Sequence, residues 1–335
     1  MILLDALYIN ESGGLRLLEY LVDELIVNDV DFFLLADVRC IGKFDYCKHV
    51  KYMPASLIER TFFYKKKADC FTKVLCFGNI PSPVKLDVPV YTYFHNINLL
   101  TLSEAQTKSL KIKSWLKRQI FRHYKSNTKY WFVQTSNTAD ELICHLGEHE
   151  ERVKLMPFYK IPSCLDQIEE LSHGNDYVYI SINAPGKGHK ELIEAWEILH
   201  GKGIDNALHL TIPDMGSSLE KRIIDAQERG VNIVNHGFIP FEKVFELYGQ
   251  SKAIIYPSHN ESLGLGIVEA ITAGCDVIGA NLPYIHSICK PSEVFNPYSP
   301  ESIADAVMRY ESGLDPKSEL LIYNHIDEII EILKE

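Results

Sequence analysis

Long apolar runs and paired cysteine motifs are both missing from this sequence of 335 residues. No run of about 18 or more apolar residues occurs, so no helix is expected to span a membrane. The N-terminus, MILLDALYIN, lacks a basic segment, and we expect a first strand there instead of a signal peptide. The eight cysteines include no CxxC pair and lie apart from histidines at zinc-binding spacing. We therefore expect buried free thiols in a reducing compartment.

Acidic and basic residues are distributed unevenly along the chain, which carries a formal net charge of −11. Residues 1–165 hold 22 Lys and Arg against 18 Asp and Glu, whereas the remainder holds 12 against 27. The acidic second half argues against a general nucleic-acid-binding protein. The two halves are expected to meet different partners.

Short apolar runs alternate with helical patterns through both halves of the chain. This alternation predicts an α/β fold in which parallel sheets are covered by helices on both faces. A length of 335 residues suits two such domains better than one core. The predicted strands are ILLDALYI, DFFLLADV, KVLCFG, PVYTYF, YWFVQTS, VKLMPF, YVYISIN, ALHLTIP, NIVNHGF, AIIYPS, DVIGAN and EVFNPY.

The polar segment at 160–176 holds no strong strand and is the expected linker. We therefore place one domain at 1–165 and a second at 166–315. Residues 316–335 should include a terminal amphipathic helix that packs back near the interdomain region. Two open α/β domains imply a cleft between them, with ligands bound beyond the carboxyl ends of the strands.

Three loops that follow predicted strands carry the candidate site residues. Gly13 and Gly14 follow the first strand, where their amides could meet a phosphate or simply form a tight turn. Lys187 lies in a Pro-Gly-Lys-Gly turn that opens a helix. A lysine there suits a phosphate dianion, although a solvated loop lysine is the alternative.

The third loop lies in HNESLGLGIVEAITAG, which follows the predicted strand AIIYPS. Glu261 is expected in the loop, and Glu269 about one turn inside the helix that follows. Amides around Gly264 and Gly266 could hold a diphosphate, with one carboxylate accepting ribose hydroxyls and the other those of an attached group. A nucleotide-sugar needs this arrangement, in which two hydrogen-bond acceptors flank an anion-binding site.

Together these motifs resemble the donor-binding domain of glycosyltransferase family 4, whose members are retaining enzymes of the GT-B fold. The resemblance covers roughly residues 177–310 and rests on three ordered segments. They are APGKGHKELIEAWEIL, NIVNHGFIPFEKVFELYGQSKAIIYPS and PSHNESLGLGIVEAITAGCDVI. The first half is similar more loosely, through its Gly13–Gly14 loop and the segments VYTYFHN and YWFVQTS. The resemblance implies two Rossmann-like domains whose parallel sheets face a central cleft.

The resemblance also implies roles for the matching residues. Glu269 would bind the donor ribose, Glu261 would contact the transferred sugar, and Lys187 would neutralise the leaving diphosphate. His95, at a strand end, would support the sugar or the reacting face, although a structural histidine is the alternative. Further contacts to the nucleotide-sugar are expected from Gly13, Gly14, Phe238, Ile239, Ser262, Leu263, Gly264, Leu265 and Gly266.

The sequence departs from the family at Ile182, where an arginine often precedes the lysine by five residues. Charge on the diphosphate would then rest on Lys187, with Lys190 as a helper or merely an exposed helix residue. The sequence has no DxD motif flanked by strands, so no metal and no cofactor are expected. The family relies instead on basic residues and helix dipoles.

Basic residues interleaved with aromatic ones gather in the first half. They suit contact with anionic lipid headgroups or a phosphate-linked acceptor, with a solvated basic face as the alternative. The residues are Arg60, Lys65, Lys66, Lys67, Lys111, Lys113, Lys117 and Arg118.

The sequence therefore predicts a cytoplasmic, metal-independent retaining glycosyltransferase, peripheral on the inner face of the plasma membrane. It would move a hexose or N-acetylhexosamine from a UDP- or GDP-linked donor to a glycan or lipid-linked glycan. The product would be a surface polysaccharide such as an O-antigen, capsule or lipopolysaccharide. Two alternatives stay open, namely a sugar-nucleotide epimerase or hydrolase on the same fold and a non-catalytic partner subunit.

Overall fold

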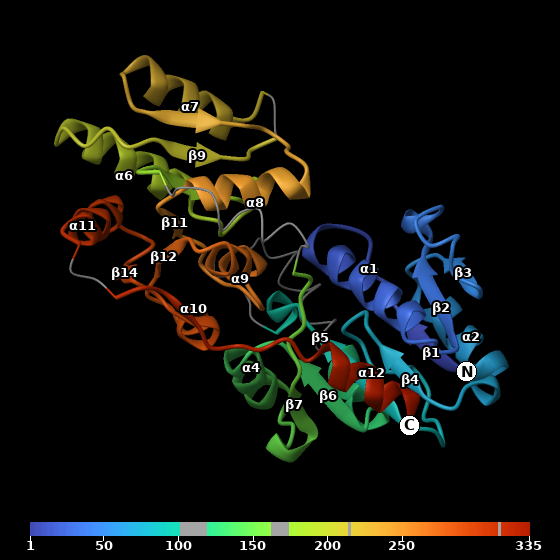
Figure 1. The fold of residues 1–335 in the computed structure, drawn as a ribbon. Coiled ribbons are helices and arrows are strands. Elements are labelled where there is room, and N and C mark those ends of the chain that lie inside the picture. The colour runs from blue at the N-terminus through green and yellow to red at the C-terminus, as the bar shows by residue number, and fades with distance from the viewer. Residues whose placement is uncertain (101–118, 162–173, 214–215, 314–315) are drawn as a thin grey trace. The chain divides into compact units, whose positions relative to one another are not determined.

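The computed structural model describes residues 1–100, 119–161, 174–213, 216–313 and 316–335 (Figure 1). They form two α/β units, one of Met1–Lys160 with Tyr323–Glu335 and one of Ile161–Ile322. Most of the predicted linker, and the predicted border at 165/166, lie outside the described residues. Within them, no helix is both long and apolar enough to cross a membrane.

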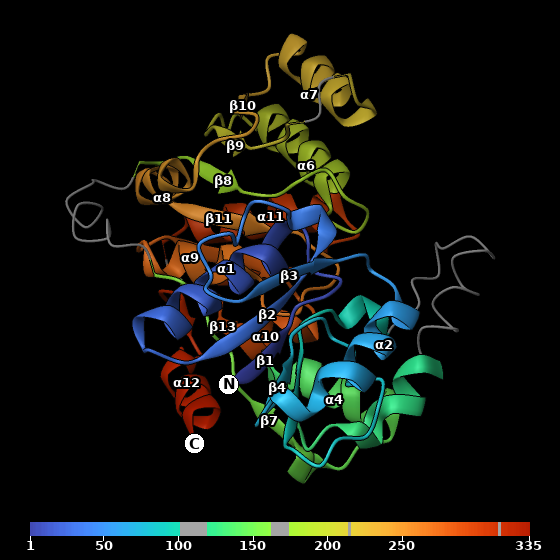
Figure 2. The same ribbon diagram turned by 90° about the vertical axis from the view of Figure 1, so that its right-hand side faces the viewer.

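The first unit is built on a seven-stranded parallel sheet in the order β3-β2-β1-β4-β5-β6-β7. Figure 2 shows α1 and α12 on one side of β1, with α2 and α4 on the other. Residues 119–124 are also helical. The elements are β1 (Ile2–Asp5), α1 (Ser12–Val27), β2 (Phe32–Asp37), β3 (Val50–Met53), α2 (Leu57–Lys67), β4 (Val74–Cys76), β5 (Val90–Phe94), β6 (Tyr130–Val133), α4 (Ser136–Leu146), β7 (Val153–Leu155) and α12 (Ile326–Lys334).

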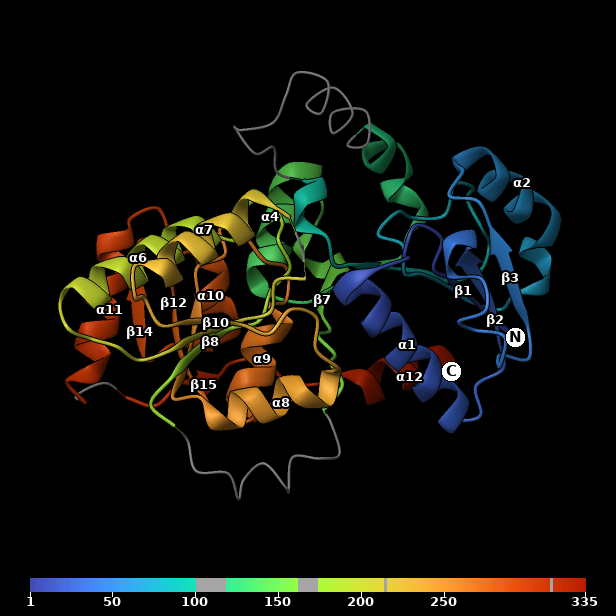
Figure 3. The same cartoon turned by 90° about the horizontal axis from the view of Figure 1, so that it is seen from above.

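The second unit has a six-stranded parallel sheet in the order β10-β9-β8-β11-β12-β14, and β13 pairs with β15 antiparallel. In Figure 3, α6 and α7 lie on one side of this sheet and α8 and α9 on the other. The elements are β8 (Tyr177–Tyr179), α6 (His189–Gly201), β9 (Leu208–Leu210), α7 (Ser218–Glu228), β10 (Ile233–Asn235), α8 (Phe241–Gln250), β11 (Ala253–Tyr256), α9 (Leu265–Thr272), β12 (Asp276–Ala280), α10 (Pro283–Ile288), β13 (Cys289–Lys290), β14 (Glu293–Phe295), α11 (Pro300–Glu311) and β15 (Glu319–Leu320).

The strands form where the sequence is continuously apolar, because both faces of each sheet are covered by helices. All residues of β1, β5, β8, β11 and β12 are buried. Every strand predicted from an apolar run is present. Strands β3, β13 and β15 were not predicted, and β3 is an edge strand with only one buried residue, Met53.

The C-terminal helix α12 belongs to the first unit, although the chain reaches it through the second. It packs beside α1, as Figures 1 and 3 show, and buries Ile326, Ile329, Ile330 and Leu333. Lys73 Nζ donates to the carbonyl of Ile332 at 2.7 Å. An apolar stripe at helical spacing therefore docks the chain end onto its first unit.

Arg60 corrects one sequence-based expectation, because it does not lie on the basic surface. It is 1% exposed, and its Nε donates to Asp5 Oδ2 at 2.7 Å. The guanidinium also donates to the carbonyls of Pro81 and Ile80, both at 2.9 Å. On α2 it shares the buried side of the helix with Tyr64, whereas Lys65, Lys66 and Lys67 are exposed as expected. Residues Lys111, Lys113, Lys117 and Arg118 lie outside the described part of the chain.

The cysteines also correct the sequence-based expectation in part. The seven described cysteines are free thiols, of which Cys70 and Cys144 are exposed and the other five are buried. Cys70 ends a 3-10 helix at Ala68–Cys70, and Cys144 lies in α4, so neither is in an apolar run of the sheet. Cys164 lies outside the described residues.

Candidate active site

The candidate residues of the second unit lie near β8 and β11, where the order in which the chain adds strands to the sheet reverses. Strands β8 and β11 are neighbours, yet the chain runs outward from β8 through β9 to β10 before it returns to β11. At such a switch point the loops beyond the two strands separate and leave room for a ligand. Lys187 follows β8, and Glu261 follows β11.

Glycine brings these two loops together. Gly188 has a φ of 68°, and a Cβ on it would lie 2.5 Å from the carbonyl oxygen of Pro257. Any side chain would therefore push the loops apart. A backbone hydrogen bond of 2.8 Å from His259 to Gly186 closes the same contact. Gly188 is also the N-cap of α6, so the Pro-Gly-Lys-Gly turn opens a helix as predicted.

Lys187 and Glu261 form an ion pair, 74 residues apart in sequence. The Nζ–Oε1 distance is 2.5 Å, and the side chains are 25% and 15% exposed. Glu261 Oε1 also accepts from Ser258 Oγ at 2.6 Å and from Tyr256 OH at 3.3 Å. All three contacts are made to one carboxylate oxygen, Oε1. They hold the carboxylate in place, and its other oxygen, Oε2, takes no part in them.

Three buried tyrosines fix the loops and were not predicted from the sequence. Tyr179 OH donates to the carbonyl of Lys187 at 2.9 Å, and Tyr284 OH donates to that of Ser258 at 2.6 Å. Burial, and then the charge of Glu261, raises the pKa of Tyr179, Tyr256 and Tyr284. All three therefore stay protonated and act as donors. In the sequence, each appears only as an aromatic residue in an apolar run, which is also the pattern of ordinary core residues.

Helix α9 begins beside this cluster. Its N-cap, Gly264, has a φ of 61°, and no side chain caps the helix. A Cβ on Gly266 would lie 3.3 Å from the Tyr256 ring and 4.0 Å from the carbonyl of Ile180, so the first turn of α9 abuts the end of β8. First-turn amides of a helix carry partial positive charge and bind anions. Glu269, in the second turn, is 6% exposed.

Some predicted residues stand apart from the Lys187–Glu261 pair. Lys190 Nζ lies 3.9 Å from Glu194 on its own helix and is 59% exposed. Ile182, at the place of the family's arginine, is 53% exposed. Phe238, in the loop after β10, is 84% exposed, and Ile239 follows it. The described residues contain no group of three or more His, Cys, Asp or Glu that could hold a metal ion.

In the first unit, His95 and Gly14 are in contact. A Cβ on Gly14 would lie 3.1 Å from His95 Cε1, so glycine allows this close approach without displacing the ring. Asn79 Oδ1 accepts from the backbone amide of His95 at 2.8 Å, and the ring packs on Phe77 and Tyr93. Burial lowers the pKa of His95 to about 4, so the imidazole is neutral at physiological pH.

The position of Gly13 and Gly14 differs from the expected one. They lie inside the first turn of α1, which begins at Ser12, and not in the loop before it. Glycine is a poor helix former, but a larger residue at position 14 would press against the ring of His95. No side chain caps the N-terminus of α1.

Known proteins share sequence or fold with this chain. Residues 166–325, just under half of the chain, match the family model described as "Glycosyl transferases group 1". A curated Escherichia coli protein, "Serotype-specific mannosyltransferase WbdA", is 28% identical over 151 residues. That alignment covers 43% of this chain and 18% of the relative, so the chain matches less than a fifth of that protein's length.

Two solved structures share the fold over nearly the whole chain. WaaG, "a glycosyltransferase involved in lipopolysaccharide biosynthesis", has a TM-score of 0.62 at 17% identity, covering 93% of this chain and 90% of its own. Anabaena HepE, solved with UDP and glucose, has a TM-score of 0.64 at 14% identity, covering 92% and 88%. The chain thus has the two Rossmann-like α/β domains of GT-B glycosyltransferases, and its second unit is similar to the group 1 glycosyl transferases.

Proposed function

We propose that this protein is a retaining glycosyltransferase that uses a UDP- or GDP-linked sugar. The observation that carries the proposal is the Lys187–Glu261 ion pair beside the uncapped N-terminus of α9, at the switch point of the second sheet. The group 1 match over residues 166–325 supports it. The transferred group would be a hexose or an N-acetylhexosamine, and the acceptor a glycan or lipid-linked glycan.

The donor diphosphate would lie against the first turn of α9. Amides near Gly264 and Gly266 supply partial positive charge, and the Lys187 ammonium supplies a full one. Glu269, one turn further along α9, would accept the ribose hydroxyls. The exposed loop at Phe238 and Ile239 would frame the nucleobase.

Glu261 would orient the transferred sugar. Its Oε1 already accepts from Lys187, Ser258 and Tyr256, which leaves Oε2 for sugar hydroxyls. A carboxylate held by three donors keeps its position when the ligand enters. This pre-organisation is what positioning catalysis requires.

Lys187 would stabilise the departing nucleoside diphosphate. As the bond between the anomeric carbon and the diphosphate oxygen breaks, negative charge grows on that oxygen, and a nearby ammonium lowers its free energy. The same oxygen would take the proton of the acceptor hydroxyl on that face of the sugar. Retention then needs no separate base and no metal.

The biological role would be assembly of a surface polysaccharide, such as an O-antigen, capsule or lipopolysaccharide, at the inner face of the plasma membrane. Helix α2 supports membrane contact, because Ile58 and Phe62 are 70% and 67% exposed beside Lys65, Lys66 and Lys67. Basic and apolar groups on one helix suit an anionic lipid surface. Flotation with anionic and neutral vesicles tests this, and Phe62→Ser should weaken binding to the anionic ones.

Product analysis tests the activity. The full chain is incubated with UDP- and GDP-linked hexoses and N-acetylhexosamines together with lipid-linked glycans. We expect mass spectrometry to show addition of one sugar residue, and NMR to show the anomeric configuration of the donor. An inverted linkage would contradict the retaining mechanism, and the absence of any product would contradict the transferase assignment.

A further inference from the structure

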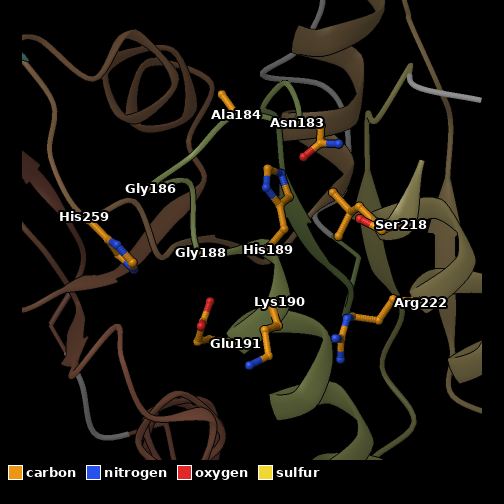
Figure 4. A pocket seen from close by; sticks show the side chains of 11 residues that line it. Asn183, Ala184, Gly186, Gly188, His189, Lys190, Glu191, Ser218, Arg222 and His259 are labelled. Carbon is orange, nitrogen blue, oxygen red and sulfur yellow. The ribbon is translucent and has the colours of Figure 1, made fainter. Parts of the chain in front are cut away.

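A pocket of about 390 Å³ lies in the second unit beside the first turns of α6 and α7 (Figure 4). Figure 4 shows the side chains of His189, Lys190 and Glu191 from α6, and those of Ser218 and Arg222 from α7, around this space. The described residues that line it include neither Lys187 nor Glu261. The pocket is therefore distinct from the proposed donor site.

The pocket and the donor site nevertheless share one loop. Gly186 and Gly188 line the pocket, and Lys187 between them reaches Glu261. His259 lines the pocket from the loop after β11, two residues before Glu261. A ligand in the pocket would thus rest on the same two loops that position the catalytic ion pair.

The charges around the pocket are balanced. Arg222 Nη1 lies 3.1 Å from Glu194 Oε1, and Lys190 Nζ lies 3.9 Å from the same atom. Glu191 is the carboxylate in the lining itself, whereas Glu194, the partner of both cations, lies outside the lining. With Glu194 counted, two cations stand against two carboxylates, so both cations are already neutralised and a phosphate dianion would gain little from them. A neutral ligand with many hydrogen-bonding groups fits better.

Two neutral imidazoles in the lining have unused hydrogen-bonding atoms. Nε2 of His189 and Nε2 of His259 are buried and have no hydrogen-bond partner among the described residues. His189 is 5% exposed, and burial lowers its pKa to about 4. Burial also lowers the pKa of His259. A neutral imidazole has one donor and one acceptor, which matches a hydroxyl group that can play either part.

The N-terminus of α6 adds further donors. This helix has 13 residues, its N-cap is Gly188, and no side chain caps it. His189, Lys190 and Glu191 form its first turn and all line the pocket. Their amides lack intrahelical acceptors, as in any helix, and offer neutral donors to a ligand oxygen. Ser218 and Asn183 contribute groups that both donate and accept.

We infer that this pocket binds a neutral sugar unit of a glycan, as a carbohydrate site separate from the one for the donor. Interspersed donors and acceptors without net charge are the chemistry that recognises a polyhydroxylated ring. A volume of about 390 Å³ is at the small end for ligand pockets and suits one sugar unit. The inference rests on the proposed function only in that the protein handles glycans.

Saturation-transfer difference NMR on the full chain tests this. The probes are the methyl α-glycosides of mannose, glucose, galactose and N-acetylglucosamine, with UDP and GDP in excess to fill the donor site. Ser218→Trp would block the pocket from an exposed position, and Ile224→Trp introduces the same residue at an exposed site of α7 outside the lining. We expect saturation of at least one glycoside in the wild type and in Ile224→Trp, and a decrease of at least fivefold in Ser218→Trp.

Several results would overturn the inference. They are no saturation of any glycoside in the wild type, or the same saturation in Ser218→Trp as in the wild type. Loss of the glycoside signal when UDP and GDP, or inorganic phosphate, are added would also overturn it. Sugar transfer is measured on the same preparations. Transfer without glycoside binding overturns this inference alone, whereas glycoside binding without transfer overturns the proposed function alone.

Discussion

Replacing Arg60 with methionine would leave the carboxylate of Asp5 buried without its cation. Asp5 is 0% exposed, and Arg60 Nε lies 2.7 Å from its Oδ2. After the substitution, Asp5 would keep Tyr64 OH at 2.6 Å and the amide of Leu7 at 3.3 Å. The carbonyls of Ile80 and Pro81 would also lose their donor. The perturbation therefore removes charge and hydrogen bonds while it nearly preserves the volume.

The expected cost follows from this geometry. Removing one partner of a buried ion pair typically destabilises a protein by about 3–5 kcal/mol, because an uncompensated charge stays in the interior. A domain has about 5–15 kcal/mol of stability in all. The loss would loosen the loop after β4, in which Asn79 holds His95. The double variant with Asp5→Asn should be more stable than Arg60→Met alone, since it removes the bare charge.

Hydrogen exchange followed by mass spectrometry measures this in each unit separately. Exchange through unfolding of the first unit should accelerate by roughly two to three and a half orders of magnitude in Arg60→Met, at about 1.4 kcal/mol per tenfold change. Peptides from β8 and β11 should exchange as in the wild type. The control is Lys66→Met on the exposed side of α2, expected to change stability by about 0.5 kcal/mol or less. If Arg60→Met matched this control, the reasoning about the buried pair would be refuted.

Three further predictions concern the candidate sites. Lys187→Met should lower kcat about 10²- to 10³-fold, because the negative charge that develops in the transition state loses its cationic partner. The control variant Lys221→Met, at an exposed position, should leave kcat unchanged. If both variants had the same kcat, Lys187 would have no role in the mechanism. Glu269→Ala should weaken UDP or GDP binding about 10- to 100-fold by calorimetry, and unchanged affinity would contradict the ribose contact. His95 has a folded pKa of about 4, below about 6.5 when unfolded, so the unfolded state binds more protons between these values. Urea unfolding should therefore show that this histidine lowers the free energy of unfolding by about 2 kcal/mol when the pH is lowered from 7 to 5. The substitution His95→Asn should remove this part of the pH dependence.

The sheets could be predicted from the sequence because parallel strands buried on both faces are continuously apolar. Strand β3 lacks that signal, because at the sheet edge its residues are mostly partly exposed. Strands β13 and β15 have two residues each and too few positions for any pattern. The terminal helix was predicted from its apolar stripe, but its packing on α1 depends on the fold and not on local sequence.

The loops after β8 and β11 could be selected from the sequence as candidate site loops, because glycine and charged residues follow buried strands there. The 2.5 Å contact between Lys187 and Glu261 could not be predicted from the sequence, since it joins residues 74 positions apart. The same is true of the tyrosines that hold these loops. Arg60 was placed wrongly from the charge of its segment, although Phe63 and Tyr64 three and four positions later mark its side of the helix as apolar.

The most direct test of the central claim is acceptor-dependent release of nucleoside diphosphate. The full chain is incubated with UDP- and GDP-linked sugars, with and without a lipid-linked glycan, and free UDP or GDP is measured. The account predicts release with at least one donor only when the acceptor is present. Equal turnover without acceptor would indicate a sugar-nucleotide hydrolase or epimerase, and no turnover with any donor would contradict the claim that the protein is an enzyme.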